Sequence, residues 1–72
     1  MTSTAIDNDG LQAQTALSGS PIYELRDLKV RPTRKDLVIS GTVSSFYHKQ
    51  LAQEVVRSVC GDASVVNSIR VQ

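Results

Sequence analysis

Few side chains in this sequence are of the types that carry covalent or metal chemistry. Among its 72 residues, His48 is the only histidine and Cys60 the only cysteine. A structural zinc site takes about four nitrogen or sulfur ligands, and a nucleophilic triad needs a base beside a Ser or Cys. One cysteine also excludes an internal disulfide. We therefore expect no enzyme activity, no metal and no cofactor, and we interpret His48 and Cys60 as packing residues.

Positive charge is concentrated in one segment. The whole chain carries a net charge of +1, whereas residues 26–36 alone carry +3. The charged residues there are Arg26, Lys29, Arg31, Arg34 and Lys35, against Asp27 and Asp36. Since a basic residue near an anionic bilayer contributes about 1 kcal/mol, the segment predicts weak, salt-sensitive adhesion to such a surface. The alternative is a solvated strand face whose charges keep an edge strand from pairing with other molecules.

Two aromatic residues, Phe46 and Tyr47, stand together before an amphipathic segment. Exposed aromatic side chains contact membrane interfaces or protein partners. The alternative is that they fold back over the start of a helix as a hydrophobic staple. The chain has one Phe, two Tyr and no Trp, and no two of them are placed on a strand to stack bases. We therefore expect no nucleic-acid partner.

A short helix is predicted near the start of the chain. Residues 1–8 are small, polar and acidic, and we expect them to be a disordered lead-in to a single domain over residues 9–72. Asp9 is placed to cap the helix, and Gly19 and Pro21 end it, the glycine by a left-handed exit.

Three strands are predicted from residues of shared parity. The inward-facing positions are Leu28 and Val30 in the first strand, Leu37, Ile39 and Val43 in the second, and Val65, Ile69 and Val71 in the third. Residues 31–36 lack an Asn-Gly or Asp-Gly pair, so we expect a wide loop there. Asn67 shares the inward parity and should bond to backbone near the helix-to-strand turn, because burying an unpaired amide costs about 1 to 3 kcal/mol. Gly41 is expected where a helix crosses close above the strand.

A longer helix is predicted over residues 46–60. Its apolar stripe at the helical period consists of Leu51, Ala52, Val55, Val56 and Val59. Ser44 or Ser45 is placed to cap its start, and Gly61 to end it. The order helix, strand, strand, helix, strand gives an α+β fold: a two-layer αββαβ sandwich with two helices on one face of a three-stranded sheet.

From about Leu11 onward the sequence resembles the BON domain family, the small modules of bacterial osmotic-stress and envelope proteins. Four segments carry the resemblance: Ser20 and Pro21 with Leu25, Leu28 and Val30; the run Leu37, Ile39, Ser40, Gly41, Thr42 and Val43; the helix with Ser45, Tyr47, Lys49, Gln50, Ala52, Gln53 and Glu54; and Gly61 followed by Val65, Val66, Asn67, Ile69 and Val71. The resemblance implies a module without catalytic residues that binds anionic phospholipid or partner proteins, in most members at the cell envelope.

The sequence thus predicts a small non-catalytic binding module. The expected contact with an anionic membrane surface or an envelope partner involves Lys29, Arg31, Arg34, Lys35, Phe46 and Tyr47, while Gly41, Ala52, Gly61 and Asn67 are structural. The alternative is a protein-interaction module in the cytoplasm, including weak self-association. We expect a cytoplasmic location because residues 1–10 have neither the basic residues nor the apolar stretch of a signal peptide.

Overall fold

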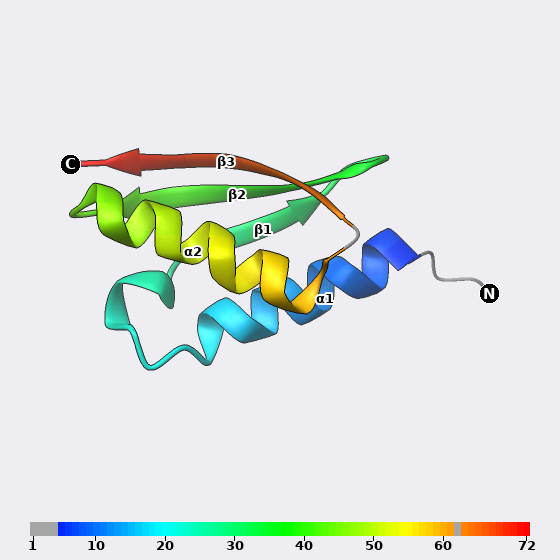
Figure 1. Cartoon of the computed structure of the whole chain (residues 1–72), viewed down its shortest axis with the longest axis horizontal. Coiled ribbons are helices and arrows are strands. Elements are labelled where there is room, and N and C mark those ends of the chain that lie inside the picture. The colour runs from blue at the N-terminus through cyan, green and yellow to red at the C-terminus, as the bar shows by residue number, and fades with distance from the viewer. Residues whose placement is uncertain (1–4, 62) are drawn as a thin grey trace.

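A computed structural model of the chain describes residues 5–61 and 63–72. Its elements in chain order are α1 (Ala5–Ser18), the 3-10 helix η1 (Tyr23–Leu25), β1 (Lys29–Pro32), β2 (Asp36–Val43), α2 (Phe46–Val59) and β3 (Ser64–Val71). The sheet order is β1-β2-β3, with β1 antiparallel and β3 parallel to the central β2. Figure 1 shows α1 running beneath β1 and α2 beside β3. The predicted α+β fold is confirmed.

The core lies between the helices and one face of the sheet. Its buried side chains are Ala13, Leu17, Leu25, Leu28, Leu37, Ile39, Val43, Ala52, Val56, Cys60 and Ile69. Odd-numbered residues of β2 and β3 point to this face because successive strand residues alternate sides. Val71 departs from the expected parity pattern, since it is exposed at the end of β3. The other face carries mostly exposed polar residues, so the sandwich has two layers.

Helix α2 begins and packs as its sequence predicts. Ser45 is the N-cap, and its hydroxyl oxygen accepts the backbone N–H of His48 at 3.2 Å. Ala52 and Val56 are buried on the face toward the sheet. The end of the helix differs from expectation, because Cys60 is the C-cap and Gly41 is the only glycine with positive φ among the described residues. Gly61 therefore does not end the helix by a left-handed turn, and neither does Gly19 end α1.

Helix α1 starts earlier than the pattern predicted. It begins at Ala5, so residues 5–8 are helical and Asp9 does not mark the first turn. The start at Asp9 was therefore wrong, because small polar residues without an apolar stripe give no helical period to detect. The remainder of the expected lead-in, residues 1–4, lies outside the described residues.

The β1–β2 hairpin is tight, not wide as predicted. The backbone N–H of Thr33 donates to the carbonyl of Asp36 at 2.8 Å, and the Asp36 N–H donates to the Thr33 hydroxyl at 3.0 Å. Only Arg34 and Lys35 lie between these two residues. A threonine side chain thus closes the turn in place of the glycine that short hairpins usually need.

Gly41 is required by a neighbour that the sequence did not identify. Its φ is +134°, a value that other residues rarely adopt, and an added Cβ would lie 2.6 Å from Leu28 Cδ2. The side chain above Gly41 therefore belongs to the segment leading into β1, and the prediction of a crossing helix was wrong. Leu28 fills the space that a side chain at position 41 would need.

Candidate functional site

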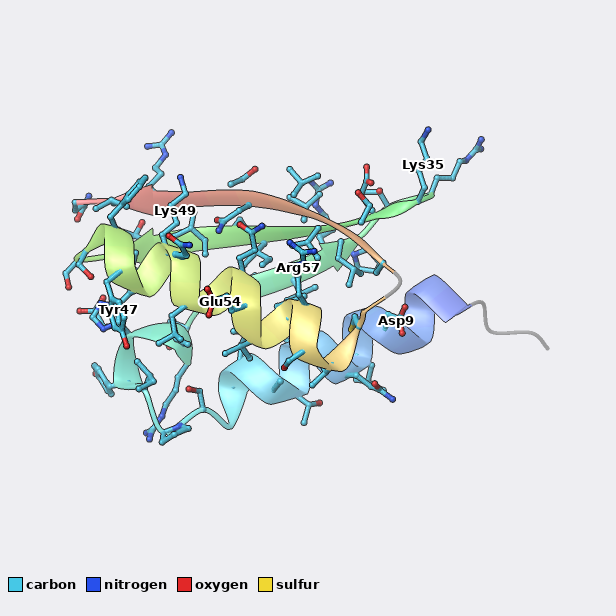
Figure 2. The ribbon with its side chains drawn as sticks, in the orientation of Figure 1. Asp9, Lys35, Tyr47, Lys49, Glu54 and Arg57 are labelled. Carbon is cyan, nitrogen blue, oxygen red and sulfur yellow. The ribbon has the colours of Figure 1, made fainter. Side chains whose placement is uncertain are left out.

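The structure does not bring the predicted binding residues together on one surface. Lys29 and Arg31 lie on β1, paired with Ser40 and Val38, and are exposed on the face of the sheet that no helix covers. Arg34 and Lys35 form the hairpin tip at the start of β2. Figure 2 shows Lys35 and Tyr47 at opposite ends of the molecule.

The separation follows from the length of β2. Phe46 and Tyr47 come directly after β2 ends, whereas the hairpin tip comes directly before it begins. A strand of eight residues is roughly 23 Å long at about 3.3 Å per residue. One flat contact through both groups would need to cover the whole length of the sheet. The basic residues and the aromatic pair are therefore two separate candidate surfaces.

A third aromatic residue, Tyr23, joins Phe46 and Tyr47. Tyr23 begins η1, which contacts α2. The next residue, Glu24, accepts hydrogen bonds from the Ser44 backbone N–H at 2.8 Å and from the Ser44 hydroxyl at 2.5 Å. These bonds hold η1 against the start of α2. We call the surface formed by Tyr23, Phe46 and Tyr47 the aromatic end.

The aromatic end contains every Phe and Tyr of the chain, and the chain has no Trp. Tyr23 is 76% exposed, Phe46 71% and Tyr47 68%. Aromatic side chains bury more apolar area than most others and usually contribute strongly to cores. Here the core is wholly aliphatic apart from Cys60, while all three aromatic rings face solvent at one end. The staple alternative for Phe46 and Tyr47 does not agree with this exposure.

Two cations accompany the aromatic end. The guanidinium carbon of Arg26 lies 6.0 Å from the centroid of the Tyr23 ring, and Arg26 Nε donates to the carbonyl of Ser20 at 2.8 Å. Lys49 Nζ lies 5.8 Å from the centroid of the Phe46 ring. Arg26 belongs to the basic segment of residues 26–36, but in the structure it lies beside Tyr23. These distances are at the outer limit of cation–π contact.

Glu24 and His48 complete this end of the molecule. The hydrogen bonds from the Ser44 hydroxyl and backbone N–H lower the pKa of Glu24. The Nδ1 atom of His48 is 2.8 Å from the Ser45 hydroxyl oxygen, and its ring meets Tyr47 edge-on with centroids 5.4 Å apart. His48 is thus held by the helix cap and by a neighbouring ring, as a structural side chain is.

Asn67 connects β3 to α2. Its side-chain amide donates to the carbonyl of Lys49 at 2.9 Å and to Gln53 Oε1 at 3.1 Å, and its oxygen accepts the backbone N–H of Ile69 at 3.2 Å. The predicted backbone bonds are present, but they reach the first half of α2 and not the helix-to-strand turn. Of the other residues predicted to be structural, Ala52 is buried in the core and Gly61 is exposed.

Gln14 is a structural residue that the sequence analysis missed. Its side-chain nitrogen donates to the carbonyl of Leu28 at 2.9 Å, and its oxygen accepts the backbone N–H of Val30 at 2.8 Å. The side chain therefore pairs with the outer edge of β1 as a neighbouring strand would. In the sequence, the one indication of this role is that Gln14 directly follows Ala13, which is buried. A glutamine at such a position can equally well point into solvent.

A groove runs between α2 and the outer side of β3. Its volume is about 240 Å³, and it is lined by Phe46, Lys49, Gln50, Gln53, Glu54, Arg57 and Asn67. In Figure 2, Lys49 and Arg57 extend from the side of α2 on which β3 lies. The charged side chains of the lining are two cations and one carboxylate, so the groove has a net positive charge. Such a groove suits an anionic ligand more than a cationic one.

His48 and Cys60 lie at opposite ends of α2, His48 in the first turn and Cys60 at the C-cap. Cys60 is buried, its Sγ donates to the carbonyl of Asp9 at 3.2 Å, and burial raises the pKa of its thiol. Within residues 5–61 and 63–72, no three His, Cys, Asp or Glu side chains gather in a way that could hold a metal ion. In the same part of the chain, neither helix is long and apolar enough to cross a membrane.

Comparison with models of known protein families shows to which family the chain belongs. The model of the BON domain matches residues 11–72, which is all of the sequence after the first ten residues. The chain belongs to the BON domain family. BON domains are in general small non-catalytic binding modules, which supports the general prediction of a binding module for this chain. A search of curated proteins found no match to the chain.

Proposed function

We propose that this BON domain binds reversibly to the surface of anionic phospholipid bilayers through its aromatic end. The observation that carries the proposal is the exposure of Tyr23, Phe46 and Tyr47 on two elements, η1 and the start of α2, that contact each other. Aromatic rings with a polar rim favour the level of the lipid headgroups, where one side is apolar and the other wet. Arg26 and Lys49 beside these rings supply attraction to anionic headgroups.

The expected binding is weak and salt-sensitive. Each basic residue near an anionic surface contributes about 1 kcal/mol, so Arg26 and Lys49 together contribute roughly 2 kcal/mol. Complete burial of a Phe side chain contributes about 1.5–3 kcal/mol, and insertion at the headgroup level recovers only part of that. The sum is enough for reversible adhesion and too small for permanent anchoring.

Co-sedimentation with vesicles tests the proposal. The chain should pellet with vesicles rich in phosphatidylglycerol at low salt, much less at high salt, and not with phosphatidylcholine alone. The double change of Phe46→Ser and Tyr47→Ser should weaken binding about tenfold or more, since a tenfold loss needs only about 1.4 kcal/mol. Leu11→Ser is the matched control, because Leu11 is a 67% exposed apolar residue on α1. Equal losses in both variants, or no pelleting at low salt, would end the proposal.

A second arm separates the aromatic end from the basic hairpin. Charge reversal of Arg34 and Lys35 should reduce vesicle binding less than the aromatic double change does, because the hairpin tip lies at the other end of β2. If hairpin reversal abolishes binding and the aromatic change does not, the contact lies on the basic surface that the sequence pattern first indicated.

A further inference from the structure

The two outer edges of the sheet differ in how they are protected. Strand β1 has four residues and ends at Pro32, and Gln14 already bonds the Leu28 carbonyl and the Val30 N–H along its outer edge. Strand β3 has eight residues, and no described strand pairs with its outer edge. An unpaired strand edge is a template for another extended chain. The edge of β3 is therefore the one that can accept a strand.

The backbone groups that face this edge follow from two hydrogen bonds. The Gln72 N–H donates to the Val43 carbonyl, so even-numbered residues along β3 turn their N–H groups toward β2. Odd-numbered residues then turn theirs outward, in agreement with the Ile69 N–H being accepted by the Asn67 side chain. Val65 and Asn67 consequently present outward N–H and C=O groups, and the Asn67 cap on Ile69 closes the edge beyond them.

The groove along α2 reaches this open part of the edge at Asn67, which is its one lining residue from β3. Lys49 is tied to Asn67 through its carbonyl, and Arg57 lies eight residues further along α2, about 12 Å at 1.5 Å per residue. Two residues four positions apart in an added strand lie on one face and are about 13 Å apart. Their side chains therefore match the distance between Lys49 and Arg57 along α2. A second copy of the chain would bring its own Lys49 and Arg57 to the same place, and like charges oppose that pairing.

We propose that an extended acidic peptide adds to the outer edge of β3 as a fourth strand. Its backbone pairs with Val65 and Asn67, and carboxylates four residues apart contact Lys49 and Arg57. Backbone pairing supplies affinity in this mode of recognition, and the side-chain contacts supply specificity. This site uses the flank of α2 and shares Lys49 with the proposed membrane contact, whereas Arg57 and the edge of β3 belong to the peptide site alone.

The test is an NMR titration of the isotope-labelled full chain with synthetic peptides. The probe is a peptide of about nine alternating Thr and Val residues with two Glu four positions apart, and its control carries Lys in place of Glu. The expected result is shift changes at Val65, Asn67 and the groove side of α2 with the Glu peptide only, together with slowed amide exchange at Val65 and Asn67. Two further peptides carry N-methyl groups on alternate amides, one on the odd and one on the even positions. Methylation of the amides that face β3 should abolish binding, whereas methylation of the amides that face away should not.

Charge reversal provides the matched variants. Arg57→Glu should weaken binding of the Glu peptide about tenfold and allow the Lys peptide to bind, whereas Arg34→Glu at the hairpin tip should change neither. Tyr47→Ala should leave peptide binding unchanged. The proposal is overturned if the Glu and Lys peptides bind alike, if both N-methylated registers bind alike, or if neither peptide shifts β3. It is also overturned if vesicles alone, or concentration of the chain alone, shift Val65 and Asn67 in the same way.

Discussion

Replacing Gly41 with alanine should destabilise the domain more than any other single glycine substitution among those described. At a φ of +134° a non-glycine residue costs about 1–3 kcal/mol in backbone strain. The new Cβ would also lie 2.6 Å from Leu28 Cδ2, and Leu28 is only 1% exposed, so moving it disturbs the packed core. Overpacking of this kind adds about 1–3 kcal/mol. Because the leucine methyl can rotate partly away, we expect a total near 2–4 kcal/mol.

The assay is urea unfolding followed by far-UV circular dichroism. A domain of 72 residues has a free energy of unfolding of about 4–11 kcal/mol, so the expected loss is a large fraction of the total. Gly61→Ala is the matched control. Its φ is not positive and the nearest atom to a new Cβ is the Arg57 carbonyl oxygen at 3.9 Å, so it should change stability by about 0.5 kcal/mol or less, or increase it slightly.

A double-mutant cycle with Leu28→Ala separates strain from crowding. Leu28→Ala alone should cost about 2–5 kcal/mol as a buried truncation. If Leu28 causes the crowding, Gly41→Ala should lower the free energy of unfolding less in the Leu28→Ala variant than in the natural chain. The loss that persists in the Leu28→Ala variant is then the backbone strain. Equal unfolding midpoints for Gly41→Ala and Gly61→Ala would refute the reasoning.

Three further outcomes are expected. Ser45→Ala should lower the free energy of unfolding by about 1 kcal/mol because it removes the N-cap bond to His48, and unchanged urea unfolding would contradict that role. Glu24→Gln should remove part of the pH dependence of stability. Since hydrogen bonds from Ser44 lower the folded-state pKa of Glu24, its stabilisation is present above the unfolded pKa and is lost as pH falls through the folded one. The stability difference between wild type and Glu24→Gln should therefore shrink on acidification below the usual carboxyl pKa, and a constant difference across that range would refute the interpretation. The buried thiol of Cys60 should react slowly with a disulfide reagent in the native chain and rapidly in urea, whereas fast native labelling would show that it is accessible.

The sequence was sufficient for the sheet core and for the longer helix. Leu37, Ile39 and Val43 alternate at a period of two, and buried strands impose that period whatever their neighbours are. Ser45 has the side chain that a helix start requires, and α2 begins immediately after it. These features depend on local chemistry, which a single sequence contains.

The missed features depend on contacts between distant segments. Tyr23 lies in a connector without periodicity, and only the Glu24 to Ser44 hydrogen bonds place it beside α2. Gln14 closes the edge of β1 across a separation of sixteen residues from Val30. The predicted lipid surface joined the hairpin residues to Phe46 and Tyr47, but the eight residues of β2 separate these two groups in space.

The most direct test of the proposed membrane contact is paramagnetic broadening of the labelled chain by spin-labelled lipid in phosphatidylglycerol-rich nanodiscs. The account predicts the strongest broadening at the amides of Tyr23, Phe46 and Tyr47, with little at the hairpin tip. Strongest broadening at Arg31, Arg34 and Lys35, or no broadening at any residue, would contradict it.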